Sequence, residues 1–254
     1  MPAPPDRIAF TVFGIDIMWY GILVTIAIAT GVCVVCFRAW KHDHTADTVI
    51  NFMLFCVPAG LIGARLYYVL FNLDDFVDNP MQVFNTRAGG LAIHGALLLG
   101  LLMALILFRV WNISPMNGLD LAAPGFAVAQ AIGRWGNYFN REAHGGPTDL
   151  PWGITVDGQN VHPTFLYESL WCFLLFLLLI RVDNRRRFEG QTFLLYCILY
   201  SLERFFVEGL RTDSLMLFDT FRQAQVLSAV VFVICGIAYL YLRRREKYRG
   251  RLFY

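Results

Sequence analysis

The sequence is poor in charged residues and almost without lysine. Only 16% of its 254 residues are charged, whereas 57% are hydrophobic. Soluble proteins carry about 25% charged residues, so this composition excludes an ordinary soluble enzyme. Lys41 and Lys247 are the only lysines, and every other basic residue except histidine is an arginine. The forked donors of arginine suit phosphate, although a coding bias toward arginine explains the surface positions equally well.

The sequence also lacks the features of most catalytic or metal-binding soluble proteins. Its six cysteines all lie in apolar runs, and Cys33 and Cys36 have no flanking charge that would lower a thiol pKa. His42 and His44 have no third ligand nearby, so we expect no metal site. No nucleotide-binding loop or serine-nucleophile elbow is present. The basic C-terminal tail is interpreted as a topology anchor that touches anionic lipid, so we expect no nucleic-acid partner.

Long apolar runs fill the chain instead. About 20 helical residues cross the roughly 30 Å of hydrocarbon in a bilayer. Seven candidate spans lie at about 18–37, 48–71, 90–110, 118–133, 164–181, 191–208 and 223–242. The first run is too long for the core of a cleavable signal, so we expect it to remain as a membrane helix. The sequence predicts an all-α polytopic membrane protein of about seven transmembrane helices, forming one integral membrane domain over residues 1–254.

The fourth candidate span is the weakest of the seven. It is too short to cross a bilayer alone, and it carries Pro124 and Gly125. It also runs directly into a polar stretch at 133–146. We expect a tilted or broken helix that ends partway through the membrane, where irregular backbone is tolerated only inside protein or beside a wet cavity.

The basic residues predict the orientation of the chain. Alternate loops place thirteen of them on one side and six on the other. The positive-inside rule then puts the C-terminus in the cytoplasm and the N-terminus outside. A small extracytoplasmic insertion of about 134–162 follows, with a hairpin expected around Asp157-Gly158.

Ionisable residues inside membrane spans are costly and indicate function by default. The candidates in or beside the spans are Arg65, His94, Arg134, Glu142, Glu168, Glu203, Arg204, Glu208 and Arg211. For Arg65, a salt bridge or a contact with backbone carbonyls that locks helices is favoured over catalysis. A lone histidine such as His94 is usually a packing residue. Glu142 and Glu168 are interpreted as partners of Arg134 and Arg141 rather than as bases.

The residues around Arg204 suggest an anion-binding cavity. Arg204 and Glu208 are four residues apart and therefore share one helix face. We expect arginine to exceed acid beside Arg134, so that an anion enters to neutralise the cluster. Asn137 and Asn140 would be uncharged donors to a phosphate head group, and a histidine at similar depth could take a proton from an incoming nucleophile.

Five blocks of sequence resemble the phosphatidylglycerol–prolipoprotein diacylglyceryl transferases of bacteria. The blocks are Trp19-Tyr20-Gly21, His94-Gly95, Gly133-Arg134-Trp135-Gly136-Asn137-Tyr138-Phe139-Asn140-x-Glu142, His162-Pro163-Thr164-x-Leu166-Tyr167-Glu168 and Arg204-Phe205-x-x-Glu208-x-x-Arg211-Thr212-Asp213. They occur in the family's order and cover most of the chain. Arg141 and Ala96 depart from the residues that the family often has there, but neither departure removes a charged group that the chemistry needs.

The resemblance implies a seven-helix enzyme of the bacterial cytoplasmic membrane that needs no metal or cofactor. It implies transfer of the diacylglyceryl group of phosphatidylglycerol to the lipobox cysteine of a prolipoprotein signal peptide, with release of glycerol phosphate. The active site would face the outer leaflet. The implied catalytic residues are His94, Arg134, Arg204 and Glu142. The implied binding and supporting residues are Tyr20, Asn137, Gly145, Tyr200, Glu208 and Arg211, to which the sequence adds Asn140.

Two other classes of function remain open from the residues alone. The central arginines could bind an anion in transit through a solute carrier, although no internal repeat of the kind found in many carriers is visible. Alternatively, the chain could be a non-catalytic lipid-binding scaffold in which the charged cluster is structural.

Overall fold

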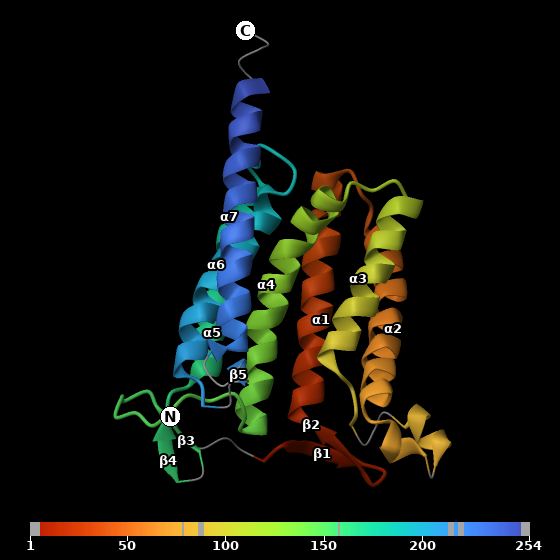
Figure 1. Ribbon diagram of the computed structural model, residues 1–254, viewed down its shortest axis with the longest axis vertical. Helices are drawn as coiled ribbons and strands as arrows, with labels where there is room; N and C mark the ends of the chain where they lie inside the picture. The colour runs from red at the N-terminus through yellow and green to blue at the C-terminus, as the bar shows by residue number, and fades with distance from the viewer. Residues whose placement is uncertain are drawn as a thin grey trace. The chain divides into compact units, whose positions relative to one another are not determined.

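The computed structural model describes residues 6–249 except for residues 78, 86–88, 157, 213–215 and 218–220. Asp157 and Asp213, named above, lie outside the described residues. Within those that are described, seven α-helices occupy the seven apolar runs (Figure 1). The helices are α1 (Trp19–Arg38), α2 (Ala46–Phe71), α3 (Ile93–Val110), α4 (Pro115–Asn140), α5 (Thr164–Asp183), α6 (Gln191–Leu210) and α7 (Gln223–Arg249).

The helices confirm a polytopic membrane protein. Among the described residues, four helices are long and apolar enough to cross a bilayer: Trp19–His42, Ala46–Phe71, Thr164–Asp183 and Gln223–Glu246. The apolar part of α3, His94–Val110, is shorter. α6 carries Glu203, Arg204 and Glu208 close together, and such charged side chains lower the mean hydropathy of a helix. α4 and α6, which are not among these four spans, supply the two arginines of the charged cluster described below.

The internal contacts divide the chain into two compact units. One unit comprises Met1–Val35 and Leu119–Tyr254, and the other comprises Cys36–Gly118. Each unit is described separately below.

In the larger unit, α4, α5 and α6 share an apolar core. Ala123 and Ala127 of α4 are fully buried, and they pack with Leu175 and Leu179 of α5 and with Tyr196 of α6. α6 also packs along α7, so that α4 to α7 lie side by side in Figure 1. Small residues on α4 allow its neighbours to approach closely, as in other membrane helix pairs.

The expectation that the fourth helix is broken is wrong. α4 runs without interruption for 26 residues, from Pro115 to Asn140, and Pro124 lies fully buried inside it. Proline removes one backbone hydrogen bond, but here close packing surrounds the ring. At Gly125, an added Cβ would lie only 2.9 Å from the carbonyl oxygen of Gly31 on α1. This close backbone contact leaves no room for the chain to diverge, and the irregular segment begins only after Asn140.

The segment between α4 and α5 contains the hairpin that the sequence predicts. Strands β3 (Ile154–Val156) and β4 (Gln159–Val161) pair antiparallel, and Gly158 has a positive φ of 80°. Their buried side chains pack against Phe165 near the start of α5. The hairpin is thus anchored to the helices rather than projecting freely from them.

The sequence analysis missed a hairpin at the N-terminus. β1 (Ile8–Val12) and β2 (Ile15–Met18) pair antiparallel and lead directly into α1. Phe13 and Gly14 form the connection with φ of 51° and 75°, the left-handed conformation that two-residue hairpin turns require. A third, shorter pair, β5 (Met216–Leu217) and β6 (Phe221–Arg222), precedes α7.

The smaller unit is built on the packing of α2 against α3. Gly63 of α2 and Gly95 of α3 face each other so closely that a Cβ on either would meet the carbonyl oxygen of the other. Three 3-10 helices, Ala39–His42, Leu73–Phe76 and Pro80–Phe84, flank α2 or follow it.

Arg65 stabilises the connection between α2 and α3. Its guanidinium donates to the backbone carbonyls of Gln82 at 2.5 Å, Val83 at 2.7 Å, Gly89 at 3.2 Å and Gly90 at 2.9 Å. These bonds confirm the carbonyl contact predicted for this residue, and they hold a loop that has little regular structure of its own.

Candidate functional site

The charged cluster is centred on one buried carboxylate, Glu168 of α5, which is only 1% exposed. Its Oε2 atom lies 2.5 Å from Nη2 of Arg134, on α4, and its Oε1 atom lies 3.3 Å from Nη1 of Arg204, on α6. Arginines from two separate helices therefore converge on one acid. The prediction that Arg134 and Arg204 meet is confirmed, and Glu168 is confirmed as a partner of Arg134.

Two further residues hold the arginines in place. Nη2 of Arg204 lies 2.7 Å from Oε2 of Glu208, one helical turn further along α6. Nη2 of Arg134 donates to the hydroxyl of Tyr200 at 3.3 Å. Tyr200 stacks on Tyr196, with 5.7 Å between the ring centroids. The stacking of half-buried Tyr200 on buried Tyr196 thus fixes the position of the Tyr200 hydroxyl, and through it the orientation of the Arg134 guanidinium.

The expected excess of arginine over acid is wrong for these residues. Glu168 and Glu208 together balance Arg134 and Arg204, and a third acid, Glu203, is also buried at 6% exposure. Neither carboxylate oxygen of Glu203 has a hydrogen-bond partner among the described residues. Because a buried charge is expensive unless it is paired, the pairing of both arginines with acids suits a low-dielectric interior, and it leaves no surplus of arginine in this set.

The arginines nevertheless keep donors for a ligand. The side chain of Arg134 is 19% exposed and that of Arg204 is 18% exposed. A guanidinium has five N–H donors. Among the described residues, the bonds of Arg134 use only Nη2, which leaves Nε and Nη1 without a protein acceptor. The cluster can therefore bind an incoming anion without first breaking its own ion pairs.

The end of α4 arranges Glu142 differently from the prediction. The side-chain amides of Asn137 and Asn140 both donate to Oε1 of Glu142, at 3.3 and 3.2 Å. The backbone N–H of Glu142 donates to the carbonyl of Asn137 at 3.1 Å. The two asparagines, predicted as donors to a head group, are thus donors to the carboxylate that follows them. Together the three residues form a polar cap on the last turn of α4.

Gly145 belongs to the framework of the site. Its N–H donates to the carbonyl of His162 at 2.9 Å, and a Cβ at this position would lie 2.6 Å from Cβ of His162 and 3.1 Å from the carbonyl oxygen of Leu210. It also forms a β-bridge with Arg211, the residue that follows α6. Only glycine fits between these segments, so this close packing fixes the loop after α4 against the end of α6.

Tyr20 lies at the start of α1 and packs against the end of α4. A Cβ added to Gly136 would lie 2.7 Å from Cδ2 of Tyr20. The preceding residue, Trp19, stacks on Phe139 with 5.1 Å between the ring centroids. The predicted Tyr20 is therefore in the same unit as the arginine cluster and contacts the helix that carries Arg134.

His94 belongs to the other unit. It lies in the first turn of α3, its side chain is exposed, and its ring centroid is 5.9 Å from that of Tyr67 on α2. The adjacent Gly95 is the residue at which α2 and α3 touch. A histidine that was predicted as either a packing residue or a base is thus held at the surface of the α2–α3 pair.

The sequence of the chain is similar to those of known proteins over nearly its whole length. The sequence model of the family described as prolipoprotein diacylglyceryl transferase matches residues 7–242. The chain belongs to the prolipoprotein diacylglyceryl transferase family. A phosphatidylglycerol–prolipoprotein diacylglyceryl transferase of Clostridioides difficile is 49% identical over 95% of this chain and 97% of its own length. The corresponding proteins of Finegoldia magna and Clostridium botulinum are 46% identical over 91% of the chain and 41% identical over 96% of it.

Membership in the diacylglyceryl transferase family confirms the resemblance that the five sequence blocks indicate. The blocks lie far apart in the sequence, yet three of them, carrying Arg134, Glu168 and Arg204, meet at the ion-pair network. The match also extends over helices α1 to α6 and over α7 as far as Leu242.

The sequence analysis undervalued two residues that the structure makes central. Glu168 was seen only as a counter-ion, although it joins the two arginines, and Asp120 was not noticed at all. Asp120 is fully buried in α4 and accepts from the N–H groups of Gly190 at 2.7 Å and Phe193 at 2.8 Å, at the start of α6. A lone acid in an apolar helix is the available signal, but the sequence does not show what it binds.

Proposed function

We propose that the protein transfers the diacylglyceryl group of phosphatidylglycerol to the thiol of a prolipoprotein, the first step of bacterial lipoprotein maturation. The chain belongs to the family, and it matches relatives with this name over nearly their whole length, which supports the activity. The observation that carries the proposal is the convergence of Arg134 and Arg204 on Glu168. The acceptor is the lipobox cysteine at the end of a signal peptide.

The reaction forms one bond and breaks one. The cysteine sulfur attacks the terminal glycerol carbon of the diacylglycerol moiety, and the bond from that carbon to the phosphate oxygen breaks. Glycerol phosphate leaves with the bonding electron pair, while the thiol proton goes to a base. Negative charge therefore accumulates on the phosphate as the transition state forms.

Arg134 and Arg204 stabilise this charge in the proposed mechanism. Their partly exposed guanidinium groups are already oriented by Glu168, Glu208 and Tyr200, so little reorganisation accompanies binding. A donor aimed at developing charge in a dry site contributes several kcal/mol. Arg211 and the polar cap formed by Asn137, Asn140 and Glu142 support the head group and the loop beside it.

We assign the role of proton acceptor to His94. A neutral imidazole nitrogen can accept a proton from a thiol, and the His94 side chain is exposed at the start of α3. His94→Asn or His94→Gln retains a hydrogen-bonding group but cannot take a proton, so we expect turnover to fall about 100-fold or more. Full activity in either variant would exclude a base and leave His94 as a residue that orients the lipid.

The topology is part of the same proposal. All seven helices cross the membrane as one domain, with the N-terminus outside and the C-terminus in the cytoplasm. The thirteen-to-six distribution of basic residues between alternate loops supports this orientation. Labelling of single cysteines introduced at Thr148 and Arg245 with an impermeant reagent tests it. Modification of position 245 from outside the intact cell would show that the C-terminus is not in the cytoplasm, and it would contradict the proposed orientation.

Transfer of labelled diacylglyceryl from phosphatidylglycerol to a synthetic lipobox peptide tests the activity. We expect the wild-type protein to label the thiol and Arg134→Lys to be about 100-fold slower, because lysine keeps the charge but not the fork. Arg244→Lys, in the exposed end of α7, is the matched control and should turn over normally. Near-normal turnover of Arg134→Lys would contradict bidentate phosphate binding.

The same preparation separates the other two classes of function. A solute carrier would move an anion into proteoliposomes without labelling the peptide. A lipid-binding scaffold would retain phosphatidylglycerol but transfer nothing. Either result would overturn the proposed reaction.

A further inference from the structure

A second cationic site lies in the larger unit, at the far end of α5 and α6 from Glu168. A cavity of about 350 Å³ opens there, lined by four arginines (Arg181, Arg185, Arg187 and Arg243) together with Gln191 and Tyr239. Gln191 begins α6 and Arg204 follows thirteen residues later, so about 20 Å of helix separates this cavity from the ion-pair network. The cavity is therefore distinct from the proposed active site.

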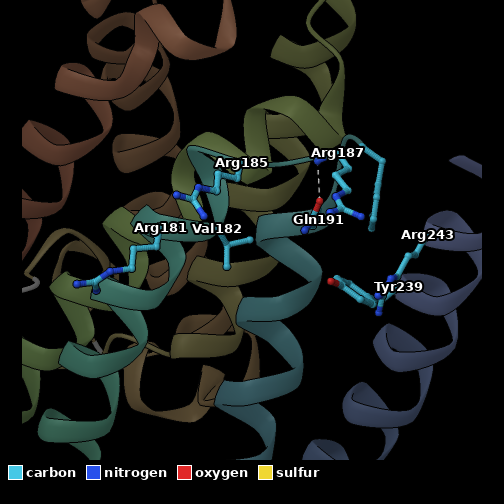
Figure 2. Close-up of a pocket in the computed structure, with 8 residues that line it drawn as sticks. Arg181, Val182, Arg185, Arg187, Gln191, Tyr239 and Arg243 are labelled. Atoms are coloured by element: carbon cyan, nitrogen blue, oxygen red, sulfur yellow. Dashed lines mark hydrogen bonds between the residues drawn. The ribbon is translucent and has the colours of Figure 1, made fainter. Parts of the chain in front are cut away.

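Figure 2 shows how the side chains surround this cavity. Arg187 and Gln191, at the turn into α6, lie on one side, and Tyr239 and Arg243 of α7 lie on the other. Arg181, in the last turn of α5, and Arg185, just after α5, lie at the margin of the cavity, with their guanidinium groups directed away from α7. Donors from three successive helices thus border one opening.

The arginines of this cavity differ from those around Glu168 in their partners. Among the described residues, none of the four forms an ion pair with a carboxylate. Their neighbour Arg186, by contrast, pairs with buried Asp120 at 3.3 Å. The side-chain oxygen of Gln191 accepts from the N–H of Arg187 at 2.7 Å, which leaves its amide nitrogen available as another donor. The lining is therefore rich in unused donors.

The position of this cavity matches the depth of lipid head groups. The apolar span of α5 ends at Asp183 and that of α7 ends at Glu246, so the arginines stand where hydrocarbon gives way to water. Phe188 packs on Tyr239 with 5.6 Å between the ring centroids, which closes the cavity with aromatic surface. Below it, α7 exposes Ile237 and Leu240, at 64% and 56%, along which acyl chains can lie.

We infer that this pocket binds the phosphate of an anionic glycerophospholipid through Arg187 and Arg243, with its acyl chains along α7. Free phosphate shares the recognised chemistry, but only a lipid also covers the exposed apolar side of α7. Binding joins α7 to the turn between α5 and α6 by bridging arginines that otherwise repel each other. The inference does not rest on the transferase reaction, because it concerns groups that the reaction does not use.

Native mass spectrometry of the full chain released from nanodiscs tests the site. Two variants each remove two positive charges from the same end of the protein. Arg187→Gln/Arg243→Gln alters the pocket, and the matched control Arg244→Gln/Arg245→Gln alters exposed positions just beyond it. Phosphatidylglycerol, phosphatidylcholine and inorganic phosphate are the three probes, and no peptide acceptor is present, so lipid retention is measured independently of turnover.

We expect the wild type and the control to retain one more phosphatidylglycerol than the pocket variant, whose affinity should fall about 25-fold, or about fivefold per guanidinium. Phosphatidylcholine should be retained more weakly, and inorganic phosphate should not displace the lipid. Equal retention by the pocket variant and the wild type would overturn the inference. Equal losses in both variants would show diffuse attraction only, and displacement by phosphate would show that the pocket takes the free anion.

Discussion

Replacement of Glu168 by glutamine tests the ion-pair network most directly. The substitution keeps the size of the side chain but removes the charge that faces Arg134 at 2.5 Å and Arg204 at 3.3 Å. Glu168 is 1% exposed, so water cannot compensate for the loss. Removing one partner from a buried ion pair costs about 3–5 kcal/mol. We expect a decrease in the free energy of unfolding within that range, toward its lower end because both arginines are partly exposed.

Equilibrium unfolding in mixed micelles, followed by circular dichroism, measures this decrease. Glu142→Gln is the control, because Glu142 is exposed and its charge should contribute less than about 1 kcal/mol. Added phosphatidylglycerol should restore part of the stability of Glu168→Gln, since its phosphate supplies the missing negative charge. If Glu168→Gln and Glu142→Gln unfold at the same concentration of denaturing detergent, the charge of Glu168 does not stabilise the network, and its proposed central position is refuted.

Three further predictions concern the framework. Gly63→Ala places a Cβ against Gly95 and should destabilise the α2–α3 pair by about 1–3 kcal/mol in thermal unfolding; Gly60→Ala, whose Cβ would meet nothing nearer than 3.5 Å, should be close to neutral. In Arg65→Lys, the lysine cannot bind all of the carbonyls that the guanidinium binds, so amide hydrogen exchange should become faster in the loop that precedes α3. Unchanged exchange would contradict the role assigned to Arg65. Asp120→Asn should cost about 1–3 kcal/mol and speed exchange at the Phe193 amide, because a neutral oxygen is a weaker acceptor for the first turn of α6; slow exchange there would show that the charge is dispensable.

The two charged sites of the larger unit illustrate opposite ways of placing arginine. Around Glu168, both arginines are paired with acids, and the residual donors are few and fixed in direction. At the second pocket, the arginines are unopposed by carboxylates in the described part of the chain and border an open cavity. Balanced charge suits a buried site that must discriminate, whereas unbalanced charge suits attraction of a head group at the membrane surface.

Several features were readable from the sequence because they depend on local pattern. Apolar runs predicted the place of each of the seven helices, although the run in α4 was too short to indicate the full length of that helix. The turn at Gly158 predicted the β3–β4 hairpin. The five motif blocks identified the family, because they combine residue type with spacing over most of the chain.

Other features depended on contacts between distant residues. The continuity of α4 through Pro124 comes from helices that pack around it, and no local rule predicts that packing. The N-terminal hairpin was missed because Phe13 adopts a positive φ that its residue type disfavours. Likewise, the side-chain amides of Asn137 and Asn140 donate to Glu142. This polar segment offers several acceptors, and the sequence does not show which of them the asparagines bind.

The sequence by itself determined that this chain is a helical membrane protein of the diacylglyceryl transferase family and that Arg134 and Arg204 carry charge into its helices. Only the tertiary structure decided that Glu168 joins them, that each of the two is paired with an acid, and that a second set of arginines forms no ion pair with a carboxylate among the residues it describes. The physical reason is that hydropathy and motif spacing are properties of neighbouring residues, whereas the partner of a buried charge is set by which helices pack together.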